Sequence, residues 1–521
     1  MNHTLRTVFA ALAAVVTCSM PLASNTQAQT CNQPLAGGTD NVAWAWGSNF
    51  NGELGDGTST QRLTPVRVQN LSGLLTVAAG GGHSLALKND HTVWTWGLNS
   101  NGQLGDGTVL ARLVPVHVSS LSGITAIAGG WFHSLALKND GTVWAWGWNR
   151  FGQLGDGTNA DRHAPVQVRN LSGVTAITAN GDHSLALKSD GTLWAWGNNF
   201  WGQLGDGTTV HRNAPVQVLN LTGVRCMAAG AEHSLALMQD GTVRAWGENV
   251  AGDLGDGTTT DRHTAVQVSS LSGVKALAAG TGFSLALKTD GTVWAWGTND
   301  FGQLGDGTNN DHHTPMEVST NVGGVLAIAA GGASSLAVRS NAIVQDWGQN
   351  MCGQLGDGST MDHPFAVQVV GIVENLNDVI AVGSGTCHTV VAGHPLTLLT
   401  VRKILVHPDH TRLRLFNIKI DGVVVRANIN GGSTTPQRMS PGTHTVSEAG
   451  GTGTPLSAFT TVIGGDCAAN GTVNLALGDN KTCTITNYDH TGGCLSPLVC
   501  CEPGDDVQGC LRCGRPAVCF N

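Results

Sequence analysis

Short runs in which apolar residues alternate with small or polar ones recur along most of the chain, separated by Gly-rich segments. One such series comprises residues 174–179, 183–188, 193–197 and 215–218. A period of two predicts strands, and an Asp-Gly pair between two runs, as at Asp190-Gly191, predicts a tight hairpin. We therefore expect a unit of four antiparallel strands.

This unit repeats seven times at a period of about 50 residues. A tryptophan recurs near the end of each third strand, at Trp46, Trp96, Trp146, Trp196, Trp246, Trp296 and Trp347. The motif Leu-Gly-Asp-Gly begins at Leu54, Leu104, Leu154, Leu204, Leu254, Leu304 and Leu355. Four-stranded units repeated radially form a β-propeller. The first repeat enters at a third strand (42–47) and the last leaves after a second strand (388–392), so both ends should complete one blade and remove the free sheet edges.

A third landmark, Ala-Gly-x-x-His-Ser-Leu-Ala-Leu, surrounds His83, His133, His183 and His233. Together these motifs resemble the regulator of chromosome condensation repeat family, which forms seven-bladed propellers. The resemblance covers residues 41–393. It implies an all-β fold that contains a seven-bladed β-propeller. Residues 395–521 lie outside this resemblance.

Alternating runs continue over residues 395–489 and predict a small antiparallel β-sandwich. The segments Pro-Gly-Thr-x-Thr-Val-Ser-Glu (441–448) and Cys-Thr-Ile-Thr-Asn (483–487) resemble the prealbumin-like or Cna-B-like domains of bacterial surface and secreted proteins. That resemblance implies a stalk or adhesion module, and we expect a disulfide between Cys467 and Cys483.

Both ends of the chain carry their own signals. Residues 1–28 have the three-part layout of a signal peptide, which predicts a secreted, periplasmic or cell-surface protein; lipid anchoring at Cys18 is the alternative. No later stretch is apolar enough to span a membrane as a helix. The tail, 490–521, is rich in cysteine, and in an oxidising compartment three disulfides of open connectivity are expected rather than a zinc site. Its cysteines are Cys494, Cys500, Cys501, Cys510, Cys513 and Cys519.

Composition and charge exclude several function classes. The 72 glycines and 15 tryptophans fit turns and blade cores, and the formal net charge of −9 leaves no basic footprint for nucleic acid. There is no Gly-x-Ser-x-Gly elbow, no His-Glu-x-x-His and no phosphate-binding loop. We therefore expect neither an enzyme nor a cofactor or metal site.

The candidate binding residues are aromatic side chains in two kinds of loop. If the strands alternate in direction, the loops after the first and third strands share one face, and these loops differ most between the copies. Exposed aromatic clusters are typical of protein-binding sites, whereas packing between blades is the alternative. The predicted partner-binding residues are Phe50, Trp131, Phe132, Trp148, Phe151, Phe200, Trp201 and Phe301.

Three repeated polar positions have structural interpretations. The histidine slot also accepts Phe283 and Ser334, so we expect a buried histidine bonded to backbone rather than a ligand or base. The aspartate of Leu-Gly-Asp-Gly is expected to be a turn residue. An arginine of the long loop should pair with an aspartate of its own or the next blade, although a basic ring for an anionic ligand is the alternative; this position holds Arg62, Arg112, Arg162, Arg212, Arg262, His312 and His363.

These observations lead to one main functional hypothesis. We expect an exported, monomeric, non-catalytic scaffold that binds a protein partner through one propeller face, as an enzyme inhibitor or an adhesion module. The alternative is nucleotide exchange on a small GTPase, as in nuclear members of the family, but export and the acidic propeller argue against it. The tryptophan clusters also resemble those of the plant ultraviolet-B receptor. That receptor repeats Gly-Trp-Arg-His-Thr, however, and here only Gly130–Ser134 approaches the motif.

Overall fold

The computed structural model describes residues 41–319, 323–340, 343–371, 379–395, 397–406, 415–429, 432–439, 442–450, 456, 459–475 and 479–489. Within these ranges the chain forms strands joined by turns, as predicted, and no helix is long and apolar enough to cross a membrane. The predicted signal peptide with Cys18, and the tail with its six cysteines, lie outside the described residues.

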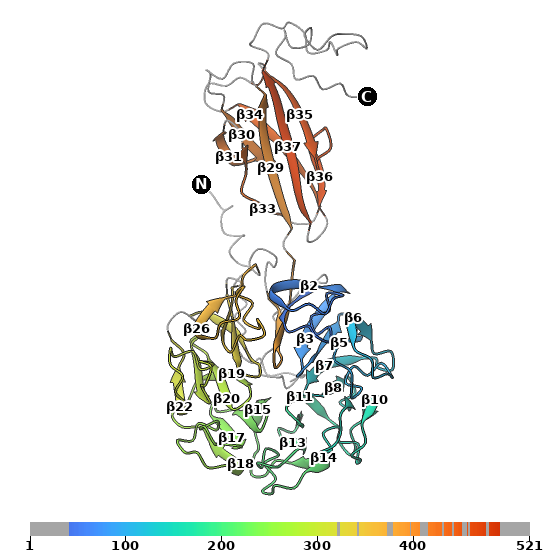
Figure 1. The fold of residues 1–521 in the computed structure, drawn as a ribbon, viewed down its shortest axis with the longest axis vertical. Helices are drawn as coiled ribbons and strands as arrows, with labels where there is room; N and C mark the ends of the chain where they lie inside the picture. The colour runs from blue at the N-terminus through green and yellow to red at the C-terminus, as the bar shows by residue number, and fades with distance from the viewer. Residues whose placement is uncertain are drawn as a thin grey trace.

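Seven four-stranded antiparallel sheets form a ring of blades (Figure 1). The first three blades are β3 (Leu74–Ala79), β4 (His83–Lys88), β5 (Val93–Gly97), β6 (Arg112–His117); β7 (Ile124–Gly129), β8 (His133–Lys138), β9 (Val143–Gly147), β10 (Arg162–Gln167); and β11 (Val174–Asn180), β12 (His183–Lys188), β13 (Leu193–Gly197), β14 (Arg212–Gln217). The next three are β15 (Val224–Ala229), β16 (His233–Met238), β17 (Val243–Gly247), β18 (Arg262–Gln267); β19 (Val274–Ala279), β20 (Phe283–Lys288), β21 (Val293–Gly297), β22 (His312–Glu317); and β23 (Val325–Ala330), β24 (Ser334–Arg339), β25 (Val344–Gly348), β26 (His363–Gln368).

The seventh blade is built from both ends of the propeller sequence, as the phase of the repeats predicts. Its strands are β1 (Val42–Gly47), β2 (Arg62–Ser72), β27 (Ala381–Ser384) and β28 (His388–Gly393), in the order β2-β1-β28-β27. The strands β1 and β28 are antiparallel and in register from Val42 opposite Gly393 to Gly47 opposite His388. The ring is therefore closed by backbone hydrogen bonds between segments about 350 residues apart.

Tryptophan joins each blade to the one before it. Trp196 of β13 is fully buried and packs with residues of the second and third blades, among them Leu135 and Ile177. Its Nε1 donates to Gln153 O of the preceding blade at 2.8 Å. The equivalent tryptophan makes the same bond in all seven blades. The repeated second tryptophan is thus an element of the contacts between blades.

The repeated histidines form a second set of contacts between blades. They are buried as predicted, but the partner is a serine hydroxyl and not the backbone: His133 Nε2 lies 2.9 Å from Ser184 Oγ of the next blade. Because Ser184 Oγ donates its proton to Gln153 O at 3.0 Å, His133 must donate through Nε2–H. The same pairing follows His83, His183, His233 and His388.

These buried imidazoles predict a loss of stability in acid. Burial lowers the pKa of His133 to about 3 and that of His233 to about 4. In the unfolded chain each imidazole binds a proton below its ordinary pKa of about 6.5. The contribution of each imidazole to the free energy of unfolding is therefore complete above that pH. It falls by roughly 1 kcal/mol per pH unit on acidification toward the folded pKa. The variant His133→Phe/His233→Phe, which copies the natural Phe283, should lose less stability between pH 7 and pH 4.5 in thermal unfolding. An equal loss in both proteins would contradict this interpretation.

A disulfide spans the junction at which the ring closes. Cys352 lies in the loop between β25 and β26 of the sixth blade, and Cys387 lies in the loop between β27 and β28 of the seventh; their Cα atoms are 5.6 Å apart. The pairing of these two scattered cysteines is not evident from the sequence. It adds a covalent link between the last sequential blade and the blade that contains both ends.

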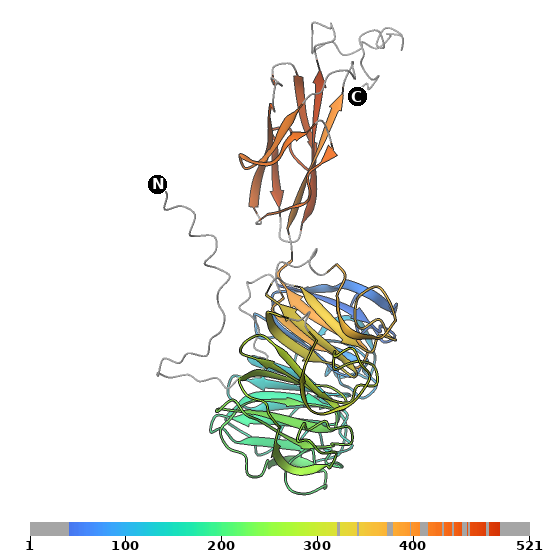
Figure 2. The same ribbon diagram turned by 90° about the vertical axis from the view of Figure 1, so that its left-hand side faces the viewer.

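Two further sheets follow the propeller and project from it beside the seventh blade (Figures 1 and 2). One contains β29 (Leu398–Val406), β32 (Gly432–Ser433), β33 (Gln437–Arg438), β35 (Phe459–Gly465) and β37 (Asn480–Asp489). The other contains β30 (Phe416–Ile420), β31 (Val423–Ile429), β34 (Gly442–Gly450) and β36 (Thr472–Leu475). The predicted antiparallel sandwich differs in one respect, because the first and last long strands, β29 and β37, pair in parallel.

The inner faces of these two sheets share one apolar core, with Val401 and Ile485 on one side and Ile418 on the other. The Cys467–Cys483 disulfide forms as expected. A buried ion pair also crosses the core: Lys403 Nζ donates to Glu448 Oε2 at 2.6 Å, and both side chains are almost fully inaccessible. Burial lowers the pKa of Lys403, and the hydrogen bond to Glu448 partly offsets this effect.

Candidate functional site

One face of the propeller is formed by the two most variable loops of every blade, which we call the loop face. In the second blade the amide of Trp148, after the third strand, donates to Phe132 O, before the second strand, at 2.9 Å. The equivalent bond in the next two blades joins Asn198 N to Asp182 O and Glu248 N to Glu232 O. Both kinds of loop therefore lie on the same face, as the alternation of strand direction predicts.

The start of each long loop requires glycine. Gly147 follows the buried tryptophan with φ of 104°, and a Cβ there would clash with Phe132 O. Only glycine adopts this conformation without strain while allowing so close an approach. The residue after this glycine, Trp148 in the second blade, is thereby directed onto the loop face next to the residue at position 132.

An asparagine organises the rest of each long loop. The Asn149 side chain donates to Asp156 Oδ1 at 3.2 Å and to Thr158 O at 3.1 Å, and its Oδ1 accepts from Leu154 N at 3.0 Å. The same residue recurs in every copy, at Asn49, Asn99, Asn199, Asn249, Asn299 and Asn350. The side chain holds a 14-residue loop in one shape, so neighbouring positions can vary without loss of the fold.

The aspartate of Leu-Gly-Asp-Gly is more than a turn residue. Asp156 Oδ2 accepts from Arg162 Nε at 2.8 Å, and its other oxygen accepts from Thr158. Burial raises the pKa of Asp156, but the bonds from Thr158 and Arg162 outweigh it and hold the pKa below its ordinary value. The predicted pairing within the loop is confirmed for Arg62, Arg112, Arg162, Arg212 and Arg262, and His312 and His363 take the same place.

The structure places five of the predicted aromatic residues in the variable loops of the second and third blades, in two groups of touching rings. Phe132 contacts Trp148 edge-on, with ring centroids 5.9 Å apart, and Trp148 contacts Phe151 at 5.5 Å. Phe151 reaches the third blade through His211 at 4.8 Å. The loop that holds His211 also carries Phe200 and Trp201, whose rings are 4.9 Å apart. We call these six residues, His211 included, the aromatic patch.

The aromatic patch remains accessible to solvent. Phe200 is 62% exposed, and Phe132, Trp148, Phe151 and Trp201 are each half-buried. Packing between blades, the alternative interpretation, applies in part to the contact of Phe151 with His211. His211 Nδ1 accepts from Asn199 N at 3.0 Å, and burial lowers the pKa of His211, so the imidazole is an uncharged member of the patch at neutral pH.

The other three predicted residues lie elsewhere. Trp131 lines the central cavity of the ring rather than the patch. Phe50 belongs to the seventh blade and is 74% exposed, and Phe301 belongs to the fifth blade, where it is half-buried. The aromatic residues that break the repeat therefore form two groups on neighbouring blades and three separate positions.

Beside the aromatic patch the same face becomes acidic, in four residues that we call the acidic row: Asp182, Glu232, Glu248 and Asp253. Gln203 Nε2 donates to Glu232 Oε2 at 2.5 Å. Burial raises the pKa of Asp182 to about 7 and, with repulsion from Asp182 and Glu248, that of Glu232 to about 8. Burial and repulsion from Glu248 also raise the pKa of Asp253 to about 8. Sequence reasoning missed this row.

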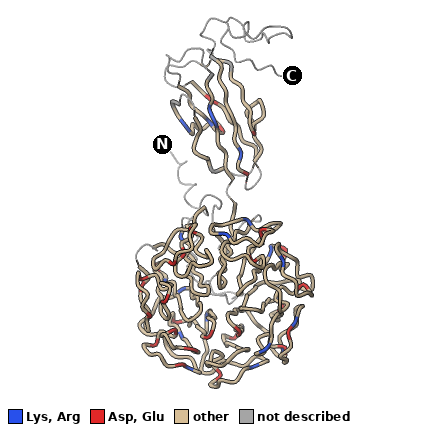
Figure 3. Tube along the Cα trace, in the orientation of Figure 1, with Lys and Arg blue, Asp and Glu red and all other residues tan. Residues whose placement is uncertain are grey.

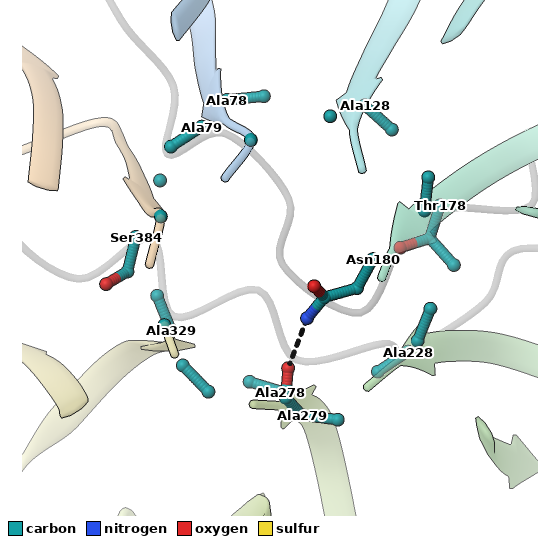
Figure 4. A pocket seen from close by; sticks show the side chains of 18 of the residues that line it. Ala78, Ala79, Ala128, Thr178, Asn180, Ala228, Ala278, Ala279, Ala329 and Ser384 are labelled. Carbon is teal, nitrogen blue, oxygen red and sulfur yellow. Dashed lines mark hydrogen bonds between the residues drawn. The ribbon is translucent and has the colours of Figure 1, made fainter. Parts of the chain in front are cut away.

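The innermost strands enclose a central cavity of about 200 Å³. Its wall is mostly alanine and glycine, as Figure 4 shows for Ala78, Ala128 and Ala228. Asn180 crosses it and donates to Ala279 O at 3.2 Å, joining the third blade to the fifth. No titratable side chain lines the cavity among the described residues, and none of their acidic, histidine or cysteine side chains is grouped to hold a metal ion.

The family model of the RCC1-like domain matches residues 44–391, two-thirds of the chain. The chain belongs to the RCC1-like domain family. Its propeller is similar in structure to Prp20p from Saccharomyces cerevisiae, at 25% identity and a TM-score of 0.64, over 72% of this chain and 96% of that protein. It is also similar to human WBSCR16, at 25% identity and a TM-score of 0.61, over 68% and 98% of the two chains. No curated protein matches the chain significantly.

One residue of this RCC1-like propeller departs from the repeat and predicts a stabilising change. In five of the other blades a glutamine, such as Gln153, accepts from a backbone amide two residues earlier, at 3.0 Å from Phe151 N, and in the seventh blade Glu53 accepts the equivalent bond from Asn51 N. Asp253 stands at the same position, 1% exposed, and its Oδ1 has no partner among the described residues. Asp253→Gln should raise the free energy of unfolding at pH 8 by about 1–3 kcal/mol.

The pH dependence of this change has a definite sign. Because the folded pKa of Asp253 is raised, the wild-type protein loses stability as pH rises from about 4 toward 8, and the variant does not. The advantage in denaturant midpoint should therefore shrink at pH 5. The reverse substitution Gln153→Asp is the control and should destabilise; an advantage of Asp253→Gln that is independent of pH would refute the assignment.

Proposed function

We propose that this chain is an exported, non-catalytic scaffold that binds a protein partner through the loop face, with the aromatic patch as the anchor. One observation carries the proposal: Trp148 touches both Phe132 and Phe151 in the loops that vary between otherwise repeated blades. Accessible aromatic rings in a rigid frame lose little entropy on binding and supply most of the energy of many interfaces.

The comparisons support protein binding as the general role. The structure of Prp20p is described together with its binding properties to Gsp1p and histones. Inhibition of an enzyme or adhesion through the two-sheet domain is the finer proposal for this chain. Export rests on the signal-peptide layout of residues 1–28, and sequencing the amino terminus of protein recovered outside the cytoplasm should give Gln29 as the first residue.

Affinity capture with the full-length mature chain tests the proposal. The partner identified by mass spectrometry should bind Trp148→Ala with an affinity lower by about 30-fold or more, as for a hot-spot residue. Phe365→Ala, which removes an exposed ring from the outermost strand of the sixth blade, should bind normally. Equal affinity of Trp148→Ala and wild-type protein would refute the role of the patch. Release of a fluorescent nucleotide from a small GTPase would favour the exchange-factor alternative.

A further inference from the structure

The acidic row continues the aromatic patch along the loop face. Asp182 and Glu232 occupy, on the third and fourth blades, the position that Phe132 occupies on the second, and each carbonyl accepts the equivalent amide bond. Glu248 stands where Trp148 stands. The acidic row therefore lies on the third and fourth blades, next to the second blade that carries Phe132 and Trp148. Acidic residues also recur around the ring in Figure 3.

We propose that the partner of the loop face carries a lysine or arginine side chain that enters the acidic row, while an apolar neighbour contacts the aromatic patch. This proposal rests on the proposed function and specifies the chemistry of the partner. It concerns a basic segment of a protein, because the aromatic patch and the acidic row together match a side chain with an apolar neighbour and a cation.

The row differs from the aspartates of the Leu-Gly-Asp-Gly motifs in having no cation. Asp156 and its equivalents each pair with an arginine or histidine of their own loop. Among the described residues no ion pair includes any of the four row residues. The charged groups that act on them are acidic as well: Asp182 and Glu248 on Glu232, and Asp261 on Glu248. Asp311 adds to the repulsion at Asp253.

The row also holds unused hydrogen-bond acceptors. Asp182 is 5% exposed and Asp253 is 1% exposed, and Oδ1 of each has no partner among the described residues. A buried acceptor without a donor destabilises the folded protein, and a bound cation with several N–H donors would supply the missing hydrogen bonds. Glu232 and Glu248 lie between these two and are half-buried, so the row is open to solvent at its centre.

Binding of a cation should be coupled to release of protons. Burial and mutual repulsion raise the pKa values of these carboxyl groups, which are partly protonated near neutral pH. A cation favours the ionised form and lowers those pKa values, so affinity should increase as pH rises from 6 to 8. One fully coupled proton changes the dissociation constant tenfold per pH unit.

A library of random dodecapeptides displayed on phage tests the proposal without a known partner. It is selected on wild-type protein, on Asp182→Asn/Glu232→Gln/Asp253→Gln, and on Asp140→Asn/Asp190→Asn/Asp290→Asn. The last variant removes the same number of carboxylates from exposed hairpin turns on the opposite face. We expect lysine and arginine next to an apolar residue to be enriched severalfold on the wild-type and control proteins, and not on the row variant.

A selected peptide is then measured by calorimetry at pH 6 and pH 8 in buffers of different ionisation enthalpy. Its dissociation constant should be at least fivefold lower at pH 8, with protons released. Lack of basic enrichment, or equal enrichment on the row variant, overturns the proposal. Selection of apolar peptides whose binding is lost in Trp148→Ala would support the proposed function and overturn the basic partner. Selection of basic peptides that bind Trp148→Ala as well as the wild-type protein would instead refute the role of the aromatic patch. Enrichment of no peptide contradicts both.

Discussion

Replacing Trp196 with alanine should lower the free energy of unfolding by about 3–5 kcal/mol. The side chain is fully buried among residues of two blades, so the cavity left behind would adjoin both of them. The change also removes the donor that Gln153 O receives from Trp196 Nε1. All 15 tryptophans lie between residues 44 and 347, so tryptophan fluorescence in a denaturant titration reports the propeller alone.

The control is the other tryptophan of the same strand. Trp194 is only partly buried, its Nε1 bonds to Thr192, and the Lys188 ammonium lies 5.6 Å from its ring. Trp194→Ala should cost about 1 kcal/mol. If both substitutions cost the same, the buried tryptophan does not have the role in joining blades that its contacts indicate.

Lys403→Met should destabilise the two-sheet domain by about 3–5 kcal/mol, because it leaves the Glu448 carboxylate buried without its cation. The loss is not offset by Thr461, which supplies a single hydroxyl donor to Glu448 Oε1 at 2.9 Å. A domain of this size should show a melting transition lowered by at least about 10 °C in calorimetry. The tryptophan fluorescence transition of the propeller should not move.

An exposed ion pair of the same domain provides the comparison. Lys481 Nζ lies 3.1 Å from Asp479 Oδ2, and both side chains are about one-third exposed. Lys481→Met should change stability by less than about 1 kcal/mol. A large effect of Lys481→Met, or a small effect of Lys403→Met, would show that burial does not decide the strength of these pairs.

The architecture was predictable because landmarks recur at a fixed spacing. The tryptophans and Leu-Gly-Asp-Gly motifs set the phase of the strands, and that phase alone predicts the seventh blade of β1, β2, β27 and β28. Contacts between blades were less accessible to sequence reasoning. His133 and Ser184 are 51 residues apart, and their pairing depends on the angle between adjacent blades. The repeated His-Ser dipeptide was the available signal.

The candidate site was predictable only in part, for a related reason. Variable loop positions identified the aromatic residues, but whether Trp131 points to the cavity or to the patch depends on side-chain direction. The acidic row needs alignment of the copies position by position, since Asp182 and Asp253 are far apart in sequence and occupy different loops. The Cys352–Cys387 disulfide was not predicted either, because its two cysteines lie in different loops of two blades.

The pairing of β1 with β28 also determines how the molecule responds to tension. Val42 lies opposite Gly393, so the chain enters and leaves the propeller at the same end of one strand pair. A pull that separates Val42 from Gly393 would open the hydrogen bonds of this pair one after another, beginning at that end. Tension applied across this pair is therefore carried first by the hydrogen bonds between the first and last strands of the propeller.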